Sequence, residues 1–294
     1  ILSDGDKEGK LILTIDYNVQ FRAEKLLERA KENLDIEGGQ IIVLDPTSGK
    51  VLALANFPNF NPNQYGEYAQ EGGLAIFQNG ASQKIFEPGS VFKPITMAAA
   101  LEEEKISPAT TYQDPGIIKI GGWPIYNYEQ RTYPGWISMT EVLEKSINTG
   151  AVFVEEKLDH NQFLEYIKNF GFFQPTGIDI SETYSENREL KKGYEINFAT
   201  ASFGQGIGMT PIQLVRAFAA IANGGRLVRP YVVEKIFRDG KTTETQPELT
   251  DSVISAKTSG QLASMLVSVV EKGFSKAVRI PGYYIAGKTG TAQV

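Results

Sequence analysis

The sequence contains no cysteine and only one histidine among its 294 residues. Without cysteine there is no disulfide, no thiol nucleophile and no cysteine-ligated zinc, and we expect neither a metal nor a cofactor. The single histidine, His160, follows a candidate N-cap, Asp159. It falls in the exposed first turn of a predicted helix, where nothing would bury or orient its ring. A nucleophilic serine in this protein would therefore need a lysine as its base.

The sequence also lacks long apolar runs and any excess of positive charge. No apolar stretch approaches the roughly 18 residues that span a bilayer, and the first residues show no signal-peptide pattern. The net charge of −6 gives no support for a nucleic-acid partner. A hydrophobic content of 41% with 22% charged residues is typical of a soluble globular protein. The length allows one large domain or two.

A serine and a lysine stand together at the start of a predicted helix. Pro88-Gly89 ends the preceding segment, and the run Ile95–Leu101 indicates a buried helix. Ser90 and Lys93 are three residues apart and would share one face of that helix. A free lysine has a pKa of about 10.4, but burial and the helix dipole would lower it, so Lys93 could act as the base for Ser90. Taken alone, the pattern fits a capping serine beside a solvated lysine more simply.

Two predicted helices meet at the polar corner Ser146-Ile147-Asn148. A capping-box pattern over Ser138–Glu141 begins the first helix, and the second starts near Thr149. The serine and the asparagine could point the same way, although two local hydrogen bonds at a corner explain the pattern more simply. Upstream of this corner, residues 105–136, which contain Gly121-Gly122 and several aromatic residues, indicate an irregular or short-strand excursion.

Three further features are predicted from local patterns. Asp16 can cap the helix that follows it. The apolar runs Gln40–Leu44 and Lys50–Asn56, separated by turn residues, predict a β-hairpin. Thr258 with Gln261 three residues later makes a capping-box pattern at the start of another helix.

The segment Tyr283–Ala292, near the end of the sequence, is predicted to form a strand that contains two glycines. Glycine in a strand often marks the close approach of a ligand or another backbone, and Lys288 with its neighbouring threonines would suit a carboxylate. An edge strand with solvated polar groups explains the segment equally well. A near-copy of its central motif, Lys257-Thr258-Ser259-Gly260, is interpreted as a helix start only.

Three motifs in one order carry a family resemblance. Ser90-Val91-Phe92-Lys93, Ser146-Ile147-Asn148 and Lys288-Thr289-Gly290 resemble the S-x-x-K, S-x-N and K-T-G signature of penicillin-binding proteins. The spacings, 146 − 90 = 56 and 288 − 146 = 142, are similar to those of the class B, monofunctional transpeptidases. The resemblance covers essentially the whole chain and is closest to the elongation (penicillin-binding protein 2) and division enzymes, with the elongation type favoured. Flanking segments add to it: Leu13–Asp16, Glu87–Gly89, Gly204–Ile207, Thr210–Leu214, Ala222–Gly225 and Gly287–Gln293.

The resemblance implies an α+β fold of the penicillin-binding and serine β-lactamase type. A mixed sheet flanked by helices would stand beside an all-helical subdomain, with the site in the cleft between them. Residues 1–294 would form one transpeptidase domain, with its sheet portion at about 38–56 and 228–294 and its helical subdomain at about 95–225. The family continues past K-T-G with two more strands and is preceded by a membrane anchor and a pedestal, so we expect this chain to lack these parts.

The resemblance also implies a mechanism for the eight motif residues. Lys93 would take the proton of Ser90 during attack on the bond between two D-alanines of a stem peptide. Ser146 would relay a proton to the leaving group, and Asn148 would bind the substrate amide. The remaining residues would hold the terminal carboxylate or let the substrate lie along the strand: Lys288, Thr289, Gly290 and Thr291. Backbone N–H groups of Ser90 and Thr291 would form the oxyanion hole.

The activity implied is a peptidoglycan D,D-transpeptidase that β-lactams acylate, at the extracytoplasmic face of the bacterial membrane beside a glycosyltransferase partner. One alternative is another acyl-serine protein: a D,D-carboxypeptidase, a β-lactam sensor or a β-lactamase. A class A β-lactamase would need a deacylating carboxylate, for which Glu186, Glu189 and Glu195 are the candidates. The other alternative is a non-catalytic cell-wall scaffold of the same fold.

Overall fold

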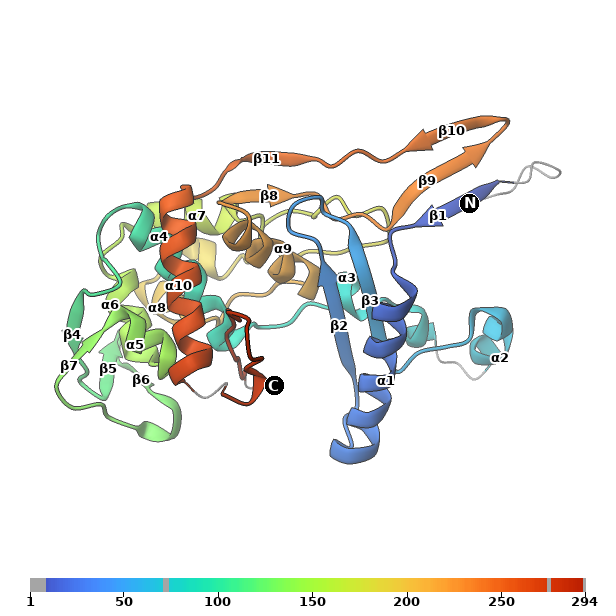
Figure 1. Cartoon of the computed structure of the whole chain (residues 1–294). Coiled ribbons are helices and arrows are strands. Elements are labelled where there is room, and N and C mark those ends of the chain that lie inside the picture. Colours follow the sequence, from blue (N-terminus) through green and yellow to red (C-terminus); the bar gives the residue numbers. More distant parts are fainter. Residues whose placement is uncertain (1–8, 71–73, 274–275, 293–294) are drawn as a thin grey trace.

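The computed structural model describes residues 9–70, 74–273 and 276–292, and it confirms the α+β class. Strands and one long helix form one side of the molecule, and a body of packed helices forms the other (Figure 1). The α-helices are α1 (Tyr17–Leu34), α2 (Tyr65–Gln70), α3 (Gly80–Gln83), α4 (Lys93–Glu102), α5 (Met139–Glu144), α6 (Asn148–Glu155), α7 (His160–Asn169), α8 (Glu195–Ala201), α9 (Pro211–Ala222) and α10 (Ala256–Lys272). The strands are β1 (Lys10–Leu13), β2 (Gly39–Leu44), β3 (Val51–Phe57), β4 (Thr111–Gln113), β5 (Ile117–Ile120), β6 (Trp123–Tyr126), β7 (Trp136–Ser138), β8 (Arg226–Val228), β9 (Val233–Arg238), β10 (Lys241–Glu244) and β11 (Leu249–Ser252).

The strand side is built from the predicted hairpin and a second antiparallel group. Strands β2 and β3 pair as a hairpin, and β1, β9 and β10 form a three-stranded antiparallel sheet. A parallel bridge between Lys50 and Tyr231 joins the two groups. Helix α1 begins where the Asp16 side chain accepts hydrogen bonds from the first turn, and it packs Ala23 and Leu27 against the hairpin. Figure 1 shows α1 lying along β2 and β3.

The helical side is organised around α4. Lys93 and every residue after it up to Leu101 are buried, as expected for a helix that is apolar on nearly all faces. Helices α6, α7 and α10 pack against α4, and their apolar side chains form one large core with it. No helix in the described part of the chain is both long enough and apolar enough to cross a membrane.

Short antiparallel pairs interrupt the helical side between α4 and α5, as the sequence predicted for this stretch. Strand β4 pairs with β7, and β5 pairs with β6. The β5–β6 connection is Gly121-Gly122, and both glycines have a positive φ, 56° and 85°. Such a pair suits the tight turns of two-residue hairpins. This hairpin stands next to α6 and α8.

The predicted strand over residues 283–293 is wrong for its described part. Residues 283–292 carry no strand assignment, and Gln293 lies outside the described residues. A strand exists only through a ladder of bonds to a partner. The segment has isolated backbone bonds instead, such as the one from the Gly287 N–H to the Leu266 carbonyl oxygen of α10 (3.3 Å). The C-terminal segment therefore lies beside α10 as an irregular loop (Figure 1).

Candidate active site

Ser90 and Lys93 meet at the start of the buried helix. A single 3₁₀ turn, Gly89–Phe92, leads directly into α4, and the Lys93 Nζ lies 2.8 Å from the Ser90 Oγ. The Lys93 side chain is completely buried. Burial lowers the pKa of Lys93 well below its usual value, and the nearby charge of Lys288 lowers it further. A neutral amine beside a serine hydroxyl can accept its proton.

The S-x-N corner completes the surroundings of this amine. The Lys93 Nζ lies 2.7 Å from the Ser146 carbonyl oxygen, 3.2 Å from the Ser146 Oγ and 2.8 Å from the Asn148 Oδ1. Ser146 has a φ of 54°, in the left-handed region that side chains other than glycine seldom adopt. This conformation turns both oxygens of Ser146 towards Lys93. Strain of this kind costs about 1–3 kcal/mol and is concentrated at functional sites.

The K-T-G segment reaches the same corner from the end of the chain. The Lys288 Nζ donates to the Ser146 Oγ (2.9 Å), and burial lowers the pKa of Lys288 to about 8. Gly290 passes so close to the 3₁₀ turn that a Cβ there would lie 2.4–2.8 Å from the Val91 side chain and the Pro88 carbonyl oxygen. A side chain at Gly290 would therefore push the whole segment away from Ser90.

Two further glycines fit the backbones together around the nucleophile. Gly89 has a φ of 56°, and a Cβ on it would collide with the Thr291 carbonyl group. Its N–H donates to the Gly204 carbonyl oxygen (2.9 Å), and Gly204 also has a positive φ, 83°. A Cβ on Gly204 would collide with Gly89. The backbone just before Ser90 thus packs against Thr291 and Gly204 more closely than a side chain at position 89 or 204 would allow.

A cleft of about 1100 Å³ opens in front of these groups. Ser90, Ser146, Asn148 and 289–292 line its polar side. Eight further lining residues are aromatic or apolar, and we call them the aromatic side of the cleft: Trp123, Pro124, Ile125, Tyr126, Tyr128, Tyr133, Ile196 and Phe203. All eight residues predicted from the motifs are therefore at this cleft or in direct contact with a residue that lines it.

The aromatic side of the cleft is the part that the sequence did not reveal. Most of it comes from β6 and the chain after it, and Ile196 and Phe203 come from α8 and the turn that follows α8. The Tyr126 carbonyl oxygen accepts a hydrogen bond from the Asn148 Nδ2 (2.8 Å). The signal in the sequence was the pair Gly121-Gly122 surrounded by aromatic residues. The sequence predicted an irregular or short-strand excursion for this stretch, which does not reveal that the hairpin formed there faces Ser90.

His160 lies outside the site, in surroundings that differ from the prediction. Its ring stacks on Phe198 with 4.0 Å between the centroids, and its Nε2 lies 3.5 Å from the Glu155 Oε1. The ring is therefore oriented, although no contact was expected for it. The expectation that it is not the base for Ser90 agrees with its position, because it is not among the residues that line the cleft.

The near-copy of the K-T-G motif is also remote from the cleft. Lys257 pairs with Glu104 (2.8 Å) on the surface, and the segment begins α10 as predicted. The cap is Ser255, whose side chain accepts from the Thr258 N–H, rather than Thr258 itself. A different residue thus caps the helix, because the helix starts one turn earlier than the capping-box pattern indicated.

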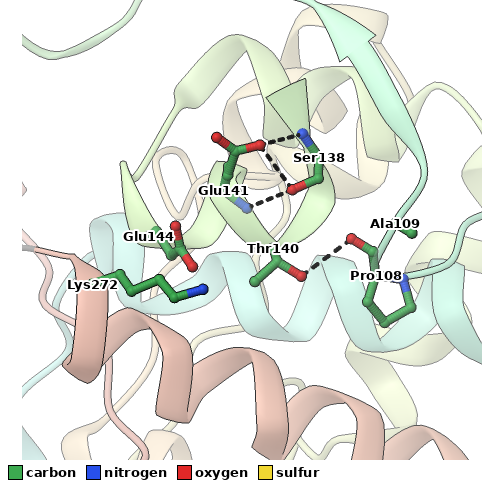
Figure 2. A pocket seen from close by; sticks show the side chains of 7 residues that line it. All are labelled: Pro108, Ala109, Ser138, Thr140, Glu141, Glu144 and Lys272. Carbon is green, nitrogen blue, oxygen red and sulfur yellow. Dashed lines mark hydrogen bonds between the residues drawn. The ribbon is translucent and has the colours of Figure 1, made fainter. Parts of the chain in front are cut away.

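A second, smaller hollow lies beside α5 (Figure 2). Its lining residues are Pro108, Ala109, Ser138, Thr140, Glu141, Glu144 and Lys272. Figure 2 shows the Glu141 carboxylate turned towards Ser138, which caps α5. The same carboxylate accepts from the Lys145 Nζ (2.8 Å), and these bonds lower the pKa of Glu141 to about 2. Because Lys145 lines the cleft, the Glu141–Lys145 pair connects a residue of this hollow with a residue of the cleft.

The candidate deacylating carboxylates of a β-lactamase are not at the cleft. Glu186 pairs with Arg188, and Glu189 pairs with Lys192, in each instance on the exposed surface. Glu195 is exposed in the first turn of α8. Among the described residues that line the cleft, the one carboxylate is that of Glu129, and it pairs with Arg131.

Comparison with known proteins gives a consistent family match. The sequence model of the penicillin binding protein transpeptidase domain matches residues 39–294. Stage V sporulation protein D of Bacillus subtilis is 35% identical over 96% of this chain and 44% of its own length. A peptidoglycan D,D-transpeptidase FtsI homolog of Mesostigma viride is 33% identical over 96% of this chain and 51% of its own. This chain thus spans about half the length of these relatives.

A solved structure gives the same result for the fold. Penicillin binding protein 3 from Mycobacterium tuberculosis, in complex with aztreonam, is 31% identical. It matches with a TM-score of 0.86 over 97% of this chain and 65% of that chain.

Proposed function

The chain belongs to the penicillin binding protein transpeptidase family, and we propose that it is the catalytic domain of a peptidoglycan D,D-transpeptidase. The observation that carries this proposal is the 2.8 Å contact between the Ser90 Oγ and a fully buried lysine amine. A lysine kept neutral by burial supplies the base that the absence of a suitable histidine would otherwise deny to the serine.

In the first half of the reaction, Ser90 attacks the carbonyl carbon of the bond between two D-alanines. The Ser90 Oγ forms a bond to that carbon while its proton passes to the Lys93 Nζ. The electron pair of the carbonyl moves to its oxygen, which the backbone N–H groups of Ser90 and Thr291 stabilise. Collapse of this intermediate breaks the peptide bond and leaves an acyl-serine.

The leaving amine takes its proton through the S-x-N corner. The Ser146 Oγ lies 3.2 Å from the Lys93 Nζ and 2.9 Å from the Lys288 Nζ. Ser146 donates its proton to the departing D-alanine nitrogen and receives one from Lys93, so the proton taken from Ser90 is returned. The relay needs contacts of hydrogen-bond length, and these side chains provide them.

Substrate binding falls to the remaining motif residues. The ammonium of Lys288 and the hydroxyls of Thr289 and Thr291 hold the terminal carboxylate, and Asn148 binds the substrate amide. Gly290 lets the donor peptide lie close to the chain. The amine of a second stem peptide then attacks the acyl-serine, which releases Ser90 and closes the cross-link. A cleft of about 1100 Å³ is large enough for both peptides.

The wider setting of the domain is part of the same proposal. Residues 1–294 form one transpeptidase domain, with its sheet portion at about 38–56 and 228–294 and its helical subdomain at about 95–225. It works at the extracytoplasmic face of a bacterial membrane beside a glycosyltransferase, and β-lactams acylate Ser90. The aztreonam complex of the mycobacterial penicillin binding protein 3 supports the last point by similarity.

Intact-mass spectrometry after incubation with a penicillin tests the proposal. The wild type should gain the mass of one penicillin, and Ser90→Ala should gain none. Ser264→Ala is the matched control, because Ser264 is an exposed serine on α10 that bonds only its own helix in the described contacts. Rapid turnover of the penicillin would indicate a β-lactamase instead. No adduct on folded wild-type protein would indicate a non-catalytic scaffold.

A further inference from the structure

Behind the S-x-N corner, one carboxylate gathers hydrogen bonds from three separate segments. The Asp114 Oδ1 accepts from the Thr149 Oγ1 (2.6 Å) and the Gly116 N–H (3.0 Å). Its Oδ2 accepts from the Tyr133 N–H (2.8 Å), and the Asn127 Nδ2 donates to both oxygens (3.2 and 3.1 Å). Bonds to an ionised carboxylate are roughly twice as strong as bonds between neutral groups.

The partners of this carboxylate are themselves buried and joined to each other. Asn127 is 3% exposed and Thr149 is fully buried. The Asn127 Oδ1 accepts from the Thr149 N–H (3.0 Å), so the asparagine links the carboxylate to the first turn of α6. The Tyr112 hydroxyl lies 3.3 Å from the Thr149 Oγ1, and burial raises the pKa of Tyr112, which keeps that hydroxyl available as a donor.

This network flanks the hydrogen bond that ties the Asn148 amide to the end of β6. Thr149 directly follows Asn148, and Asn127 directly follows Tyr126. Between these two pairs, the Asn148 Nδ2 donates to the Tyr126 carbonyl oxygen (2.8 Å). With its Nδ2 held there, the amide has only its Oδ1 to present to Lys93, and that oxygen lies 2.8 Å from the Lys93 Nζ.

We propose that Asp114 is a positioning residue, which aligns Asn148 with Lys93 by holding the aromatic side of the cleft against the start of α6. The inference rests on the proposed acyl-serine function. The carboxylate touches neither Ser90 nor Lys93 in the described contacts; it acts through Thr149 and Asn127. A misplacement of about 1 Å at a catalytic group costs up to about a hundredfold in rate, so loosening this frame should be visible in acylation.

The main test compares the rate of acylation by a saturating penicillin in wild type and Asp114→Asn. The amide keeps one oxygen and replaces the other by an N–H₂, with almost no change in size. Either the Thr149 hydroxyl and the Gly116 N–H or the Tyr133 N–H then lose their acceptor. Folded Asp114→Asn should be acylated about tenfold to a hundredfold more slowly than wild type. The matched control is Asp179→Asn, which removes a carboxylate that accepts from the Val232 and Val233 N–H groups (2.8 and 2.7 Å), remote from the cleft.

A double-mutant cycle separates positioning from a general loss of stability. If Asp114 acts through Asn148, then adding Asp114→Asn to Asn148→Ala should slow acylation no further. A structural role alone would lower the unfolding midpoint while leaving the acylation rate of the folded fraction unchanged, as we expect for Asp179→Asn. Thr149→Val, which loses the hydroxyl, should be slow, and Thr149→Ser, which keeps it, should be close to wild type.

The outcomes distinguish this inference from the proposed function. Acylation of the wild type with an unchanged rate in folded Asp114→Asn overturns the positioning role alone, as do additive losses in the cycle. A wild type that forms no adduct overturns the acyl-serine function, and the positioning role with it.

Discussion

Replacing Lys288 by methionine tests how much one positive charge contributes to the base. The Lys93 and Lys288 Nζ atoms lie 3.2 and 2.9 Å from the same Ser146 Oγ, so they are at most 3.2 + 2.9 = 6.1 Å apart. Two unit charges at that distance repel by about 2.7 kcal/mol at an effective dielectric constant of about 20. This energy corresponds to about a hundredfold in the ratio of neutral to protonated Lys93.

The sign of the effect follows from the charge state of each lysine. Burial lowers the pKa of Lys288 to about 8, so Lys288 is mostly charged at pH 7 and opposes protonation of Lys93. In Lys288→Met this repulsion is gone, the pKa of Lys93 rises and less of the neutral base is present. Acylation at pH 7 should therefore fall by up to about a hundredfold and recover as the pH is raised.

The assay is the acylation rate constant of a fluorescent penicillin, measured at saturation from pH 5 to 10. At saturation the rate constant no longer depends on how tightly the penicillin carboxylate binds, which Lys288→Met also weakens, so it reports on the base. Lys288→Arg keeps the charge and should retain the wild-type pH profile at a lower affinity. A uniform loss at every pH, with an unchanged midpoint of the pH profile in Lys288→Met, would refute the reasoning and leave burial alone as the cause of the low pKa of Lys93.

Three further predictions concern the backbone, the buried acid and the near-copy motif. Gly290→Ala should abolish adduct formation in folded protein, because its Cβ would collide with Val91; normal acylation would contradict the close approach. Burial raises the pKa of Glu155 to about 8 from 4.5, so between these values the folded state binds more protons than the unfolded state. The free energy of unfolding therefore falls as the pH rises, by up to about 1.4 kcal/mol per pH unit. Urea unfolding of Glu155→Gln at pH 5.5 and 8 should show a gain over wild type that grows with pH, and a constant difference would argue against it. Lys257→Met should leave acylation unchanged and hardly move the unfolding midpoint, since it removes one exposed pair with Glu104; slower acylation would contradict this.

Local sequence rules predicted most of the helix starts and the chemistry of the motifs. Asp16 and Ser138 cap their helices as expected, and the Gln40–Asn56 hairpin forms with nearly the predicted bounds. These features depend on contiguous residues, because a cap or a tight turn is settled within one turn of chain. Ser90 and Lys93 meet for the same reason, since three residues on a helix bring side chains to one face.

Features that need a distant partner were predicted less well. The segment Tyr283–Ala292 has strand-like residues, but in the described chain no ladder partner makes it a strand. His160 was expected to be solvated, yet Phe198 from another helix stacks on its ring. The hairpin on the aromatic side of the cleft was visible in the sequence only as an irregular or short-strand excursion, with no indication of what it faces.

The sequence by itself determined which functional groups this protein has. It has no cysteine and a single histidine outside the three motifs, a serine and a lysine in the first motif, a lysine in the third, and glycines where backbones must pass closely. Only the tertiary structure decided which lysines are buried and lie at the site. Lys257 and Lys288 stand in nearly identical motifs, but the first is exposed beside Glu104 and the second reaches Ser146 from 142 residues away. The pKa of Lys93 is likewise lowered well below its usual value because α4 is enclosed by other helices. Desolvation sets these pKa values, and it is a property of the packed interior rather than of any neighbouring residue in the chain.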